Sequence, residues 1–171
     1  EKLPEGGAPP WCEEMTIRDL LTMRTCYEST TFKRYDGDWV ESFFRVTPDH
    51  VPGTVFNYDT SASHVLAALV EKPTGMDMLD YLRKKVLRRV GFSEEAYILK
   101  DPYGVSQGGS GLVSKLSDLA GIAMLCCRGG VLDGEQLIPA DFLREATACQ
   151  VPTNLQPTFD EQLGYGFMMW K

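Results

Sequence analysis

Apolar residues recur at helical spacing along most of the chain. From Thr60 the apolar positions advance by three and four, which predicts a helix with one apolar stripe that ends near Gly75. The stripe consists of Ala62, Val65, Leu66 and Leu69. Five further helices are predicted where a residue suited to a helix start precedes a similar pattern, at Thr16, Asp38, Thr74, Ser114 and Pro139.

Both ends of the chain lack this spacing. Residues 1–15 are rich in proline and glycine, which predicts an extended lead-in. Residues 163–171 are rich in aromatic residues and predict a strand that stops at Lys171 in the middle of its pattern. The expected fold is therefore mostly α, as a single helical domain over residues 1–171.

Composition narrows the class of protein. With 171 residues, 43% of them apolar, the chain is long enough for one domain with a substantial core. Its net charge of −7 and lack of a basic run argue against a nucleic-acid partner. No apolar run approaches the roughly 20 residues that span a bilayer, which predicts no membrane span in this chain.

The start of the chain and its cysteines bear on its origin. The first methionine is Met15, which indicates a piece of a longer protein. The five cysteines are odd in number and show no Cys-x-x-Cys spacing, so we interpret them as free thiols of a reducing compartment, which favours the cytoplasm. A secreted or cell-envelope protein remains the alternative if a leader precedes residue 1.

Several kinds of catalytic site find no support. A Ser-His-Asp triad needs a histidine, and we interpret His50 and His64 as structural polar residues. Metal ligands at short defined spacings are absent, so no metal site and no cofactor are predicted. The glycine cluster at residues 107–111 lacks the lysine of a phosphate-binding loop and predicts a tight turn.

Tyr58 stands at a junction between a turn and a helix. It follows Pro52-Gly53-Thr54 and the aromatic Phe56, and its helix closes on Lys-Pro-Thr-Gly at residues 72–75. This segment resembles the catalytic tyrosine segment of the class C β-lactamase-like serine hydrolases, a family that includes DD-peptidases and esterases. Three other blocks extend the resemblance in the correct order: residues 15–22 are similar to "TIRHLLTH", residues 108–120 to "GGGLVSTARDLA", and residues 164–167 to the start of "GYGFGW".

The resemblance implies a fold and a chemistry. In this family the helical domain packs on an α/β sheet domain, and the serine of a Ser-x-x-Lys motif attacks a carbonyl to form an acyl-enzyme. The tyrosine of a Tyr-x-Asn motif helps to take the serine proton, which a phenol with an ordinary pKa of about 10 can do only beside a cation. The implied catalytic residues are Tyr58 and Thr60, with substrate contacts from Gln107, Gly109 and Ser110 and from the loop at residues 26–32.

The chain departs from the family pattern in two ways. No serine occurs in residues 1–15, where the Ser-x-x-Lys motif would have to precede the "TIRHLL" block, and the chain ends where the sheet strand would follow. Thr60 replaces the asparagine of the Tyr-x-Asn motif, which makes β-lactam hydrolysis less certain than ester or amide hydrolysis. The chain then corresponds to the middle, helical portion of the fold, lacking most of the α/β domain.

Three hypotheses follow. The first is a fragment of an acyl-enzyme hydrolase that supplies the tyrosine half of the site for an acyl substrate and is inactive alone. The second is a non-catalytic helical binding or regulatory module on the same scaffold. The third is a purely structural domain, which predicts a buried Tyr58, whereas the first predicts an exposed phenol on a concave face. A helical half without its partner is also expected to self-associate through exposed apolar surface.

Overall fold

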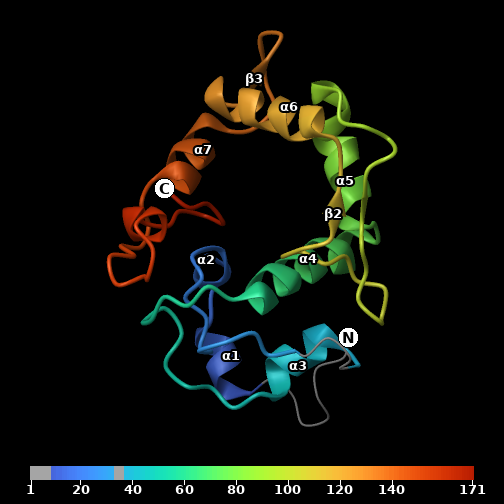
Figure 1. Cartoon of the computed structure of the whole chain (residues 1–171). Coiled ribbons are helices and arrows are strands. Elements are labelled where there is room, and N and C mark those ends of the chain that lie inside the picture. Colours follow the sequence, from blue (N-terminus) through green and yellow to red (C-terminus); the bar gives the residue numbers. More distant parts are fainter. Residues whose placement is uncertain (1–8, 33–36) are drawn as a thin grey trace.

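Helices make up most of the regular structure in the computed structural model, which describes residues 9–32 and 37–171 (Figure 1). The prediction of a mostly helical fold is therefore confirmed. In chain order the α-helices are α1 (Pro10–Glu14), α2 (Ile17–Leu21), α3 (Trp39–Arg45), α4 (Thr60–Thr74), α5 (Met78–Lys85), α6 (Leu116–Cys127) and α7 (Ala140–Thr147). Short 3₁₀ turns, η1 (Leu87–Val90) and η2 (Asp160–Leu163), follow α5 and α7.

Two of the predicted helix starts have the expected caps. The Thr16 side chain accepts from the Asp19 amide while the Asp19 carboxylate accepts from the Thr16 amide, which is the reciprocal box that starts α2. Asp38 accepts from the Glu41 amide at 2.9 Å and starts α3.

Other helix starts were wrong by one to three residues. Thr74 is the last residue of α4, where its hydroxyl donates to the Val70 carbonyl at 2.7 Å, so Asp77 precedes α5 instead. Lys115, and not Ser114, precedes α6, because the Asp118 carboxylate accepts from the Lys115 amide at 2.9 Å. Pro139 likewise precedes α7 by one position.

The extended lead-in was wrong over residues 10–14, which form α1, while residues 1–8 lie outside the described part of the chain. Pro10 suits a first helical turn. Trp11 then packs edge-on against Tyr27, with 5.6 Å between ring centroids, and stacks on Phe44. The burial of this aromatic ring favours a helix that the local sequence does not indicate.

The predicted C-terminal strand is also replaced by a more compact arrangement. Leu163 ends η2, and Tyr165 forms antiparallel bridges with both Val151 and Trp170. The chain must therefore reverse between Tyr165 and Trp170, and it does so at Met168, whose φ is +56°.

Two antiparallel strand pairs complete the regular structure. Strand β1 (Tyr97–Ile98) pairs with β2 (Leu112–Val113), and β3 (Val131–Leu132) pairs with β4 (Glu135–Gln136). The β3–β4 hairpin turns at Asp133 and Gly134, with φ of +50° and +82°, as a two-residue hairpin requires. The turn predicted at Asp133-Gly134 is confirmed.

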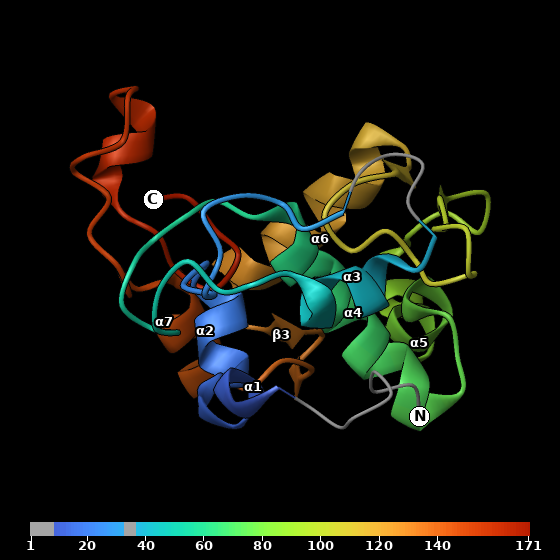
Figure 2. The same cartoon turned by 90° about the horizontal axis from the view of Figure 1, so that it is seen from below.

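The helices α4, α5, α6 and α7 follow one another around a ring that returns to α2 (Figure 1). The segment after η2, residues 164–171 and here called the tail, closes the ring, because the Met168 amide donates to the Leu21 carbonyl at 2.9 Å. Arg18 of α2 adds a hydrogen bond to Gln150, an ion pair with Glu145 and a position 5.0 Å above the Phe167 ring. Helix α3 packs against α4 on the outer side of the ring (Figure 2).

Two apolar clusters hold the ring together. The first joins α2, α3, α4 and the tail through the buried residues Leu20, Met23, Cys26, Tyr27, Phe43, Ala62, Val65 and Tyr165. The second joins α5, η1 and the segment before β1 through Leu79, Leu87, Phe92 and Ala96. Of the stripe predicted for α4, Ala62 and Val65 are buried, while Leu69 is 46% exposed. Within the described residues, each helix is too short or too polar to cross a membrane.

Candidate active site

Tyr58 lies two residues before α4 and presents its ring to the surface. Its side chain is 57% exposed. The ring stacks on Trp170, with 5.5 Å between centroids, and meets Tyr165 edge-on at 6.2 Å. Aromatic side chains of the C-terminal segment therefore hold one side of the phenol and leave the rest accessible. This exposure contradicts the structural hypothesis, which required a buried Tyr58.

The backbone on both sides of Tyr58 is anchored to residues 23–27. The Asn57 amide donates to the Met23 carbonyl at 2.9 Å, and the Asn57 side chain donates to the Tyr27 carbonyl at 3.2 Å. The Asp59 amide lies 3.4 Å from the Met23 sulfur. These contacts fix the position of a residue that lies outside any regular element.

Asp59, which separates the two predicted catalytic residues, is the cap of α4. Its carboxylate is fully buried and accepts from the Ser61 amide at 2.8 Å, from the Ser61 hydroxyl and from Thr25 at 3.4 Å. Burial raises the pKa of this carboxyl above its ordinary value, and the donated hydrogen bonds offset only part of that effect. Asp59, and not the adjacent Thr60, is therefore the cap of α4.

Thr60 occupies the first turn of α4, where it meets the glycine cluster. A Cβ added to Gly109 would lie 2.7 Å from the Thr60 methyl group, and one added to Gly108 would lie 2.1 Å from the Ser63 carbonyl oxygen. Two residues without side chains are thus required for this close approach. The glycine cluster is a tight backbone contact against α4, as predicted.

Tyr58 lines a concave surface, here called the Tyr58 groove, with a volume of about 390 Å³. The walls come from α2, α4, the glycine cluster and the tail. Besides Tyr58 they comprise Leu21, Met23, Ser63, Leu66, Ala67, Val70, Met78, Gly108, Gly109, Tyr165 and Met168. The groove is therefore mostly apolar, with the Tyr58 and Ser63 hydroxyls among its polar groups.

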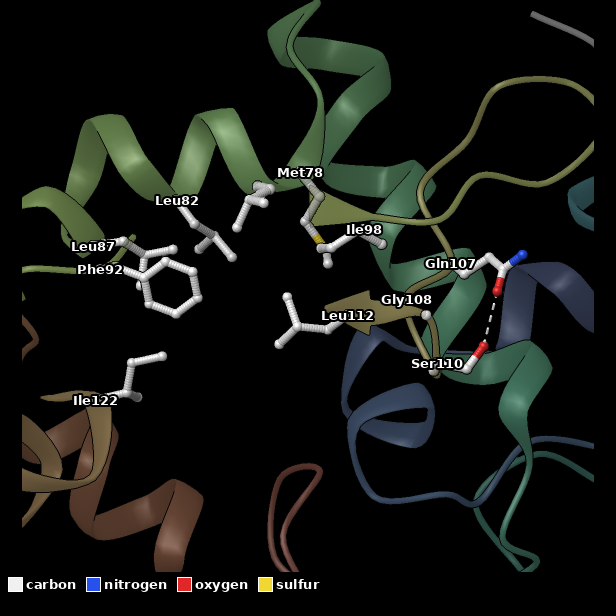
Figure 3. Close-up of a pocket in the computed structure, with 13 residues that line it drawn as sticks. Met78, Leu82, Leu87, Phe92, Ile98, Gln107, Gly108, Ser110, Leu112 and Ile122 are labelled. Carbon is white, nitrogen blue, oxygen red and sulfur yellow. Dashed lines mark hydrogen bonds between the residues drawn. The ribbon is translucent and has the colours of Figure 1, made fainter. Parts of the chain in front are cut away.

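Gln107 and Ser110 line a neighbouring space, here called the apolar hollow, of about 440 Å³. At the edge of the apolar hollow, the Ser110 hydroxyl donates a hydrogen bond of 3.1 Å to Gln107 Oε1 (Figure 3). Its other walls are aliphatic or aromatic side chains that point toward a common space, including Met78, Leu82, Leu87, Phe92, Leu112 and Ile122. Met78, Gly108 and Gly109 line both the groove and the hollow.

The structure thus brings some of the predicted site residues together and separates others. Tyr58 and Gly109 line one groove, and Thr60 contacts Gly109. Gln107 and Ser110 face the apolar hollow instead. The loop at residues 26–32 is not among the lining of the Tyr58 groove. In this loop Cys26 and Tyr27 are buried and Phe32 stacks on Trp39, while Glu28 and Ser29 are exposed.

The contributions of Ser63, Met168 and Trp170 were missed by the sequence reasoning. Ser63 follows Thr60 by one helical turn, so the i, i+3 spacing could have placed it beside the site. Trp170 was assigned to a strand, and its stacking on Tyr58 depends on the reversal at Met168. Groups of His, Cys, Asp or Glu side chains arranged to hold a metal ion are absent from the described part of the chain.

Comparisons with known proteins place these features in a family. A search of curated proteins gave no match to the sequence. Among solved structures, a protein titled "putative beta-lactamase" from Bacteroides dorei superposes with a TM-score of 0.71 at 15% identity, over 94% of this chain and 54% of that protein. The octameric penicillin-binding protein homologue from Pyrococcus abyssi gives 0.64 at 17% identity, over 94% and 46%. The penicillin-binding protein from Bacillus halodurans gives 0.65 at 16% identity, over 91% and 57%.

At these identities the likeness shows the fold alone. The chain spans about half the length of the structures that it matches, so its helical ring corresponds to a portion of their fold. The family model described as Beta-lactamase matches residues 3–171, which is nearly the whole sequence. The chain therefore belongs to the Beta-lactamase family.

Proposed function

We propose that this chain supplies the tyrosine half of the active site of a serine hydrolase that forms an acyl-enzyme with an amide, β-lactam or ester substrate. The observation that carries the proposal is the position of Tyr58, exposed at a concave groove while its backbone is fixed on both sides. A phenol placed there can reach a substrate or a serine that lies in the groove. The acyl substrate is the partner that this site implies.

The phenol would act on the serine of a Ser-x-x-Lys motif, a spacing that does not occur in this sequence. In the proposed reaction the oxygen of a Ser-x-x-Lys serine attacks the substrate carbonyl, and its proton passes to Tyr58 Oη, whose anionic form the lysine ammonium favours. The proton then goes to the leaving amine or alcohol, and water releases the acyl group in the second half of the cycle. The serine that lines the groove, Ser63, has its hydroxyl 3.9 Å from the Met168 sulfur. We therefore expect no turnover from the 171-residue chain alone.

The test compares Tyr58→Phe with the parent in a longer protein that joins this chain to a Ser-x-x-Lys segment. Because one proton-transfer group is removed while the ring is kept, we expect kcat/KM for a chromogenic β-lactam or short-chain ester to fall by about 10² to 10⁴. Tyr97→Phe is the matched control, because Tyr97 is also exposed, at 52%, but lies in β1. Equal rates for Tyr58→Phe and the parent would remove Tyr58 from the mechanism.

A non-catalytic binding or regulatory module on the same scaffold is the second candidate. Thr60 favours it, since a threonine hydroxyl cannot both donate and accept over the reach of the asparagine amide that it replaces. This candidate predicts binding of acyl compounds without turnover even when a Ser-x-x-Lys segment is present. Thr60→Asn in the longer protein separates the two candidates. A catalytic site should change its rate of substrate turnover, whereas a binding module should show no turnover with either residue.

A further inference from the structure

A buried pair joins His64 of α4 to Asp101, which follows β1, away from the Tyr58 groove. His64 Nε2 donates to Asp101 Oδ2 at 3.1 Å, and their side chains are 1% and 0% exposed. Neither residue lines the Tyr58 groove or the apolar hollow. Burying two polar side chains is costly unless each meets a partner, so this pair needs an explanation beyond apolar packing.

On one side, the pair secures the loop that carries the glycine cluster. The other oxygen of Asp101 accepts from the amides of Tyr103 and Val105, both at 2.9 Å, and thereby shapes the turn that follows β1. Two residues further on from this turn, Gln107 returns to pair with Leu99, and Gly108 then rests against Ser63 of α4. His64 is thus a side-chain anchor between α4 and the loop at residues 99–111.

On the other side, the imidazole packs against Phe32 and the first residue of α3. Its ring lies edge-on to Phe32 and Trp39, with centroids 5.7 and 5.3 Å away, and these two rings stack on each other at 4.1 Å. The neighbouring Thr31 amide donates to Ser61 Oγ at 3.3 Å on the same helix. One side chain therefore contacts the loop at residues 26–32 and also the loop at residues 99–111, which carries Gln107, Gly109 and Ser110 further along.

We propose that His64 is a positioning residue for the Tyr58 site, which sets where the loops at residues 26–32 and 99–111 sit against the first turns of α4. The inference rests on the proposed function, since it concerns substrate placement at that site. His64 acts through Asp101, Phe32 and Trp39 and touches no reacting atom. Its loss should loosen Gly108 and Gly109, which form a wall of the Tyr58 groove.

The first experiment uses the 171-residue chain itself and measures amide hydrogen exchange. In His64→Phe the link to Asp101 is lost, so we expect the Val105 and Gln107 amides to exchange at least about tenfold faster. Amides within α6 should be unchanged. His50→Phe is the matched control, because the His50 imidazole lies 3.1 Å from the Thr25 carbonyl, beside the loop at residues 26–32, while the amides that are followed belong to the loop at residues 99–111. Asp101→Asn, which keeps one acceptor oxygen, gives a second variant if His64→Phe does not fold.

The second experiment measures steady-state kinetics in the longer protein. We expect His64→Phe to raise KM by about tenfold with kcat within about threefold of the parent, and His64→Gln, which retains an N–H donor, to recover part of the loss. Tyr58→Phe should instead lower kcat. Unchanged loop exchange, or faster exchange with an unaltered KM, would overturn the positioning role. A parent without any turnover would contradict the proposed function itself, and with it a role for His64 at that site.

Discussion

At the residue scale, the ionisation of Asp59, which caps α4, makes the stability of the folded chain depend on pH. Its pKa is raised above the ordinary 3.8 chiefly by burial, so the folded chain favours the protonated acid more than the unfolded chain does. The protonated Asp59 side chain therefore stabilises the folded chain fully at pH values below its pKa in the unfolded chain. This stabilisation is lost as the pH rises through its pKa in the folded chain. Asparagine keeps an acceptor for the Ser61 amide and cannot ionise.

We therefore expect the free energy of unfolding of the parent, relative to Asp59→Asn, to decrease between pH 4 and pH 7. Urea denaturation of both proteins across this range measures the difference. Asp141→Asn is the control, since the Asp141 side chain is 88% exposed in the first turn of α7. A difference that is constant or grows with pH would show that the hydrogen bonds to Asp59 outweigh its burial.

The residues at this site differ in how far the sequence could predict them. The order of blocks around Tyr58 was enough to identify the family, because local turn and helix signals survive in sequence. The cap of α4 could not be chosen from the local sequence, since Asp59 and Thr60 are adjacent residues that can both cap a helix. The choice between them is made by Thr25, which contacts Asp59 from a distant segment.

At the scale of elements, the contact between α4 and the glycine cluster leaves no room for a side chain at Gly108. A Cβ at Gly108 would lie 2.1 Å from the Ser63 carbonyl oxygen, so Gly108→Ala forces two backbone segments apart. We expect this variant to lose about 1–3 kcal/mol of stability in chemical denaturation. Gly37→Ala is the matched control, because its nearest neighbour would be the Tyr103 hydroxyl at an ordinary 3.5 Å. Equal stability of the two variants would show that the loop can move away from α4.

Periodicity predicted the elements that depend on their own sequence and missed those that depend on distant partners. Helices α4 and α6 carry long apolar repeats, and both occur where expected. Helix α1 is held by Trp11 against Tyr27 and Phe44, which no local pattern encodes. The C-terminal strand pattern was overridden because Tyr165 pairs with Val151 and Trp170 at once.

At the scale of the whole molecule, the ring holds together through contacts between its two ends. The tail reaches α2 by the Met168–Leu21 hydrogen bond and the position of Arg18 above Phe167. Tyr58 is stacked on Trp170 of the same tail. The geometry of the proposed half-site therefore depends on ring closure as well as on α4. The sequence indicated α4 but not the closure, which requires the tail to fold back.

The walls of the ring carry more exposed apolar surface than an isolated chain easily keeps in water. The apolar hollow and the Tyr58 groove are lined largely by aliphatic and aromatic side chains, of which Leu112 is 43% and Tyr58 57% exposed. We expect the 171-residue chain to self-associate with increasing concentration, measured by sedimentation velocity. Leu112→Asp should shift the distribution toward monomer, because it places a charge in the wall of the hollow. Leu155→Asp should not, since Leu155 is 91% exposed and lines neither space. A monomer at all concentrations with high thermal stability would contradict this expectation and would mean that the ring is stable as it stands.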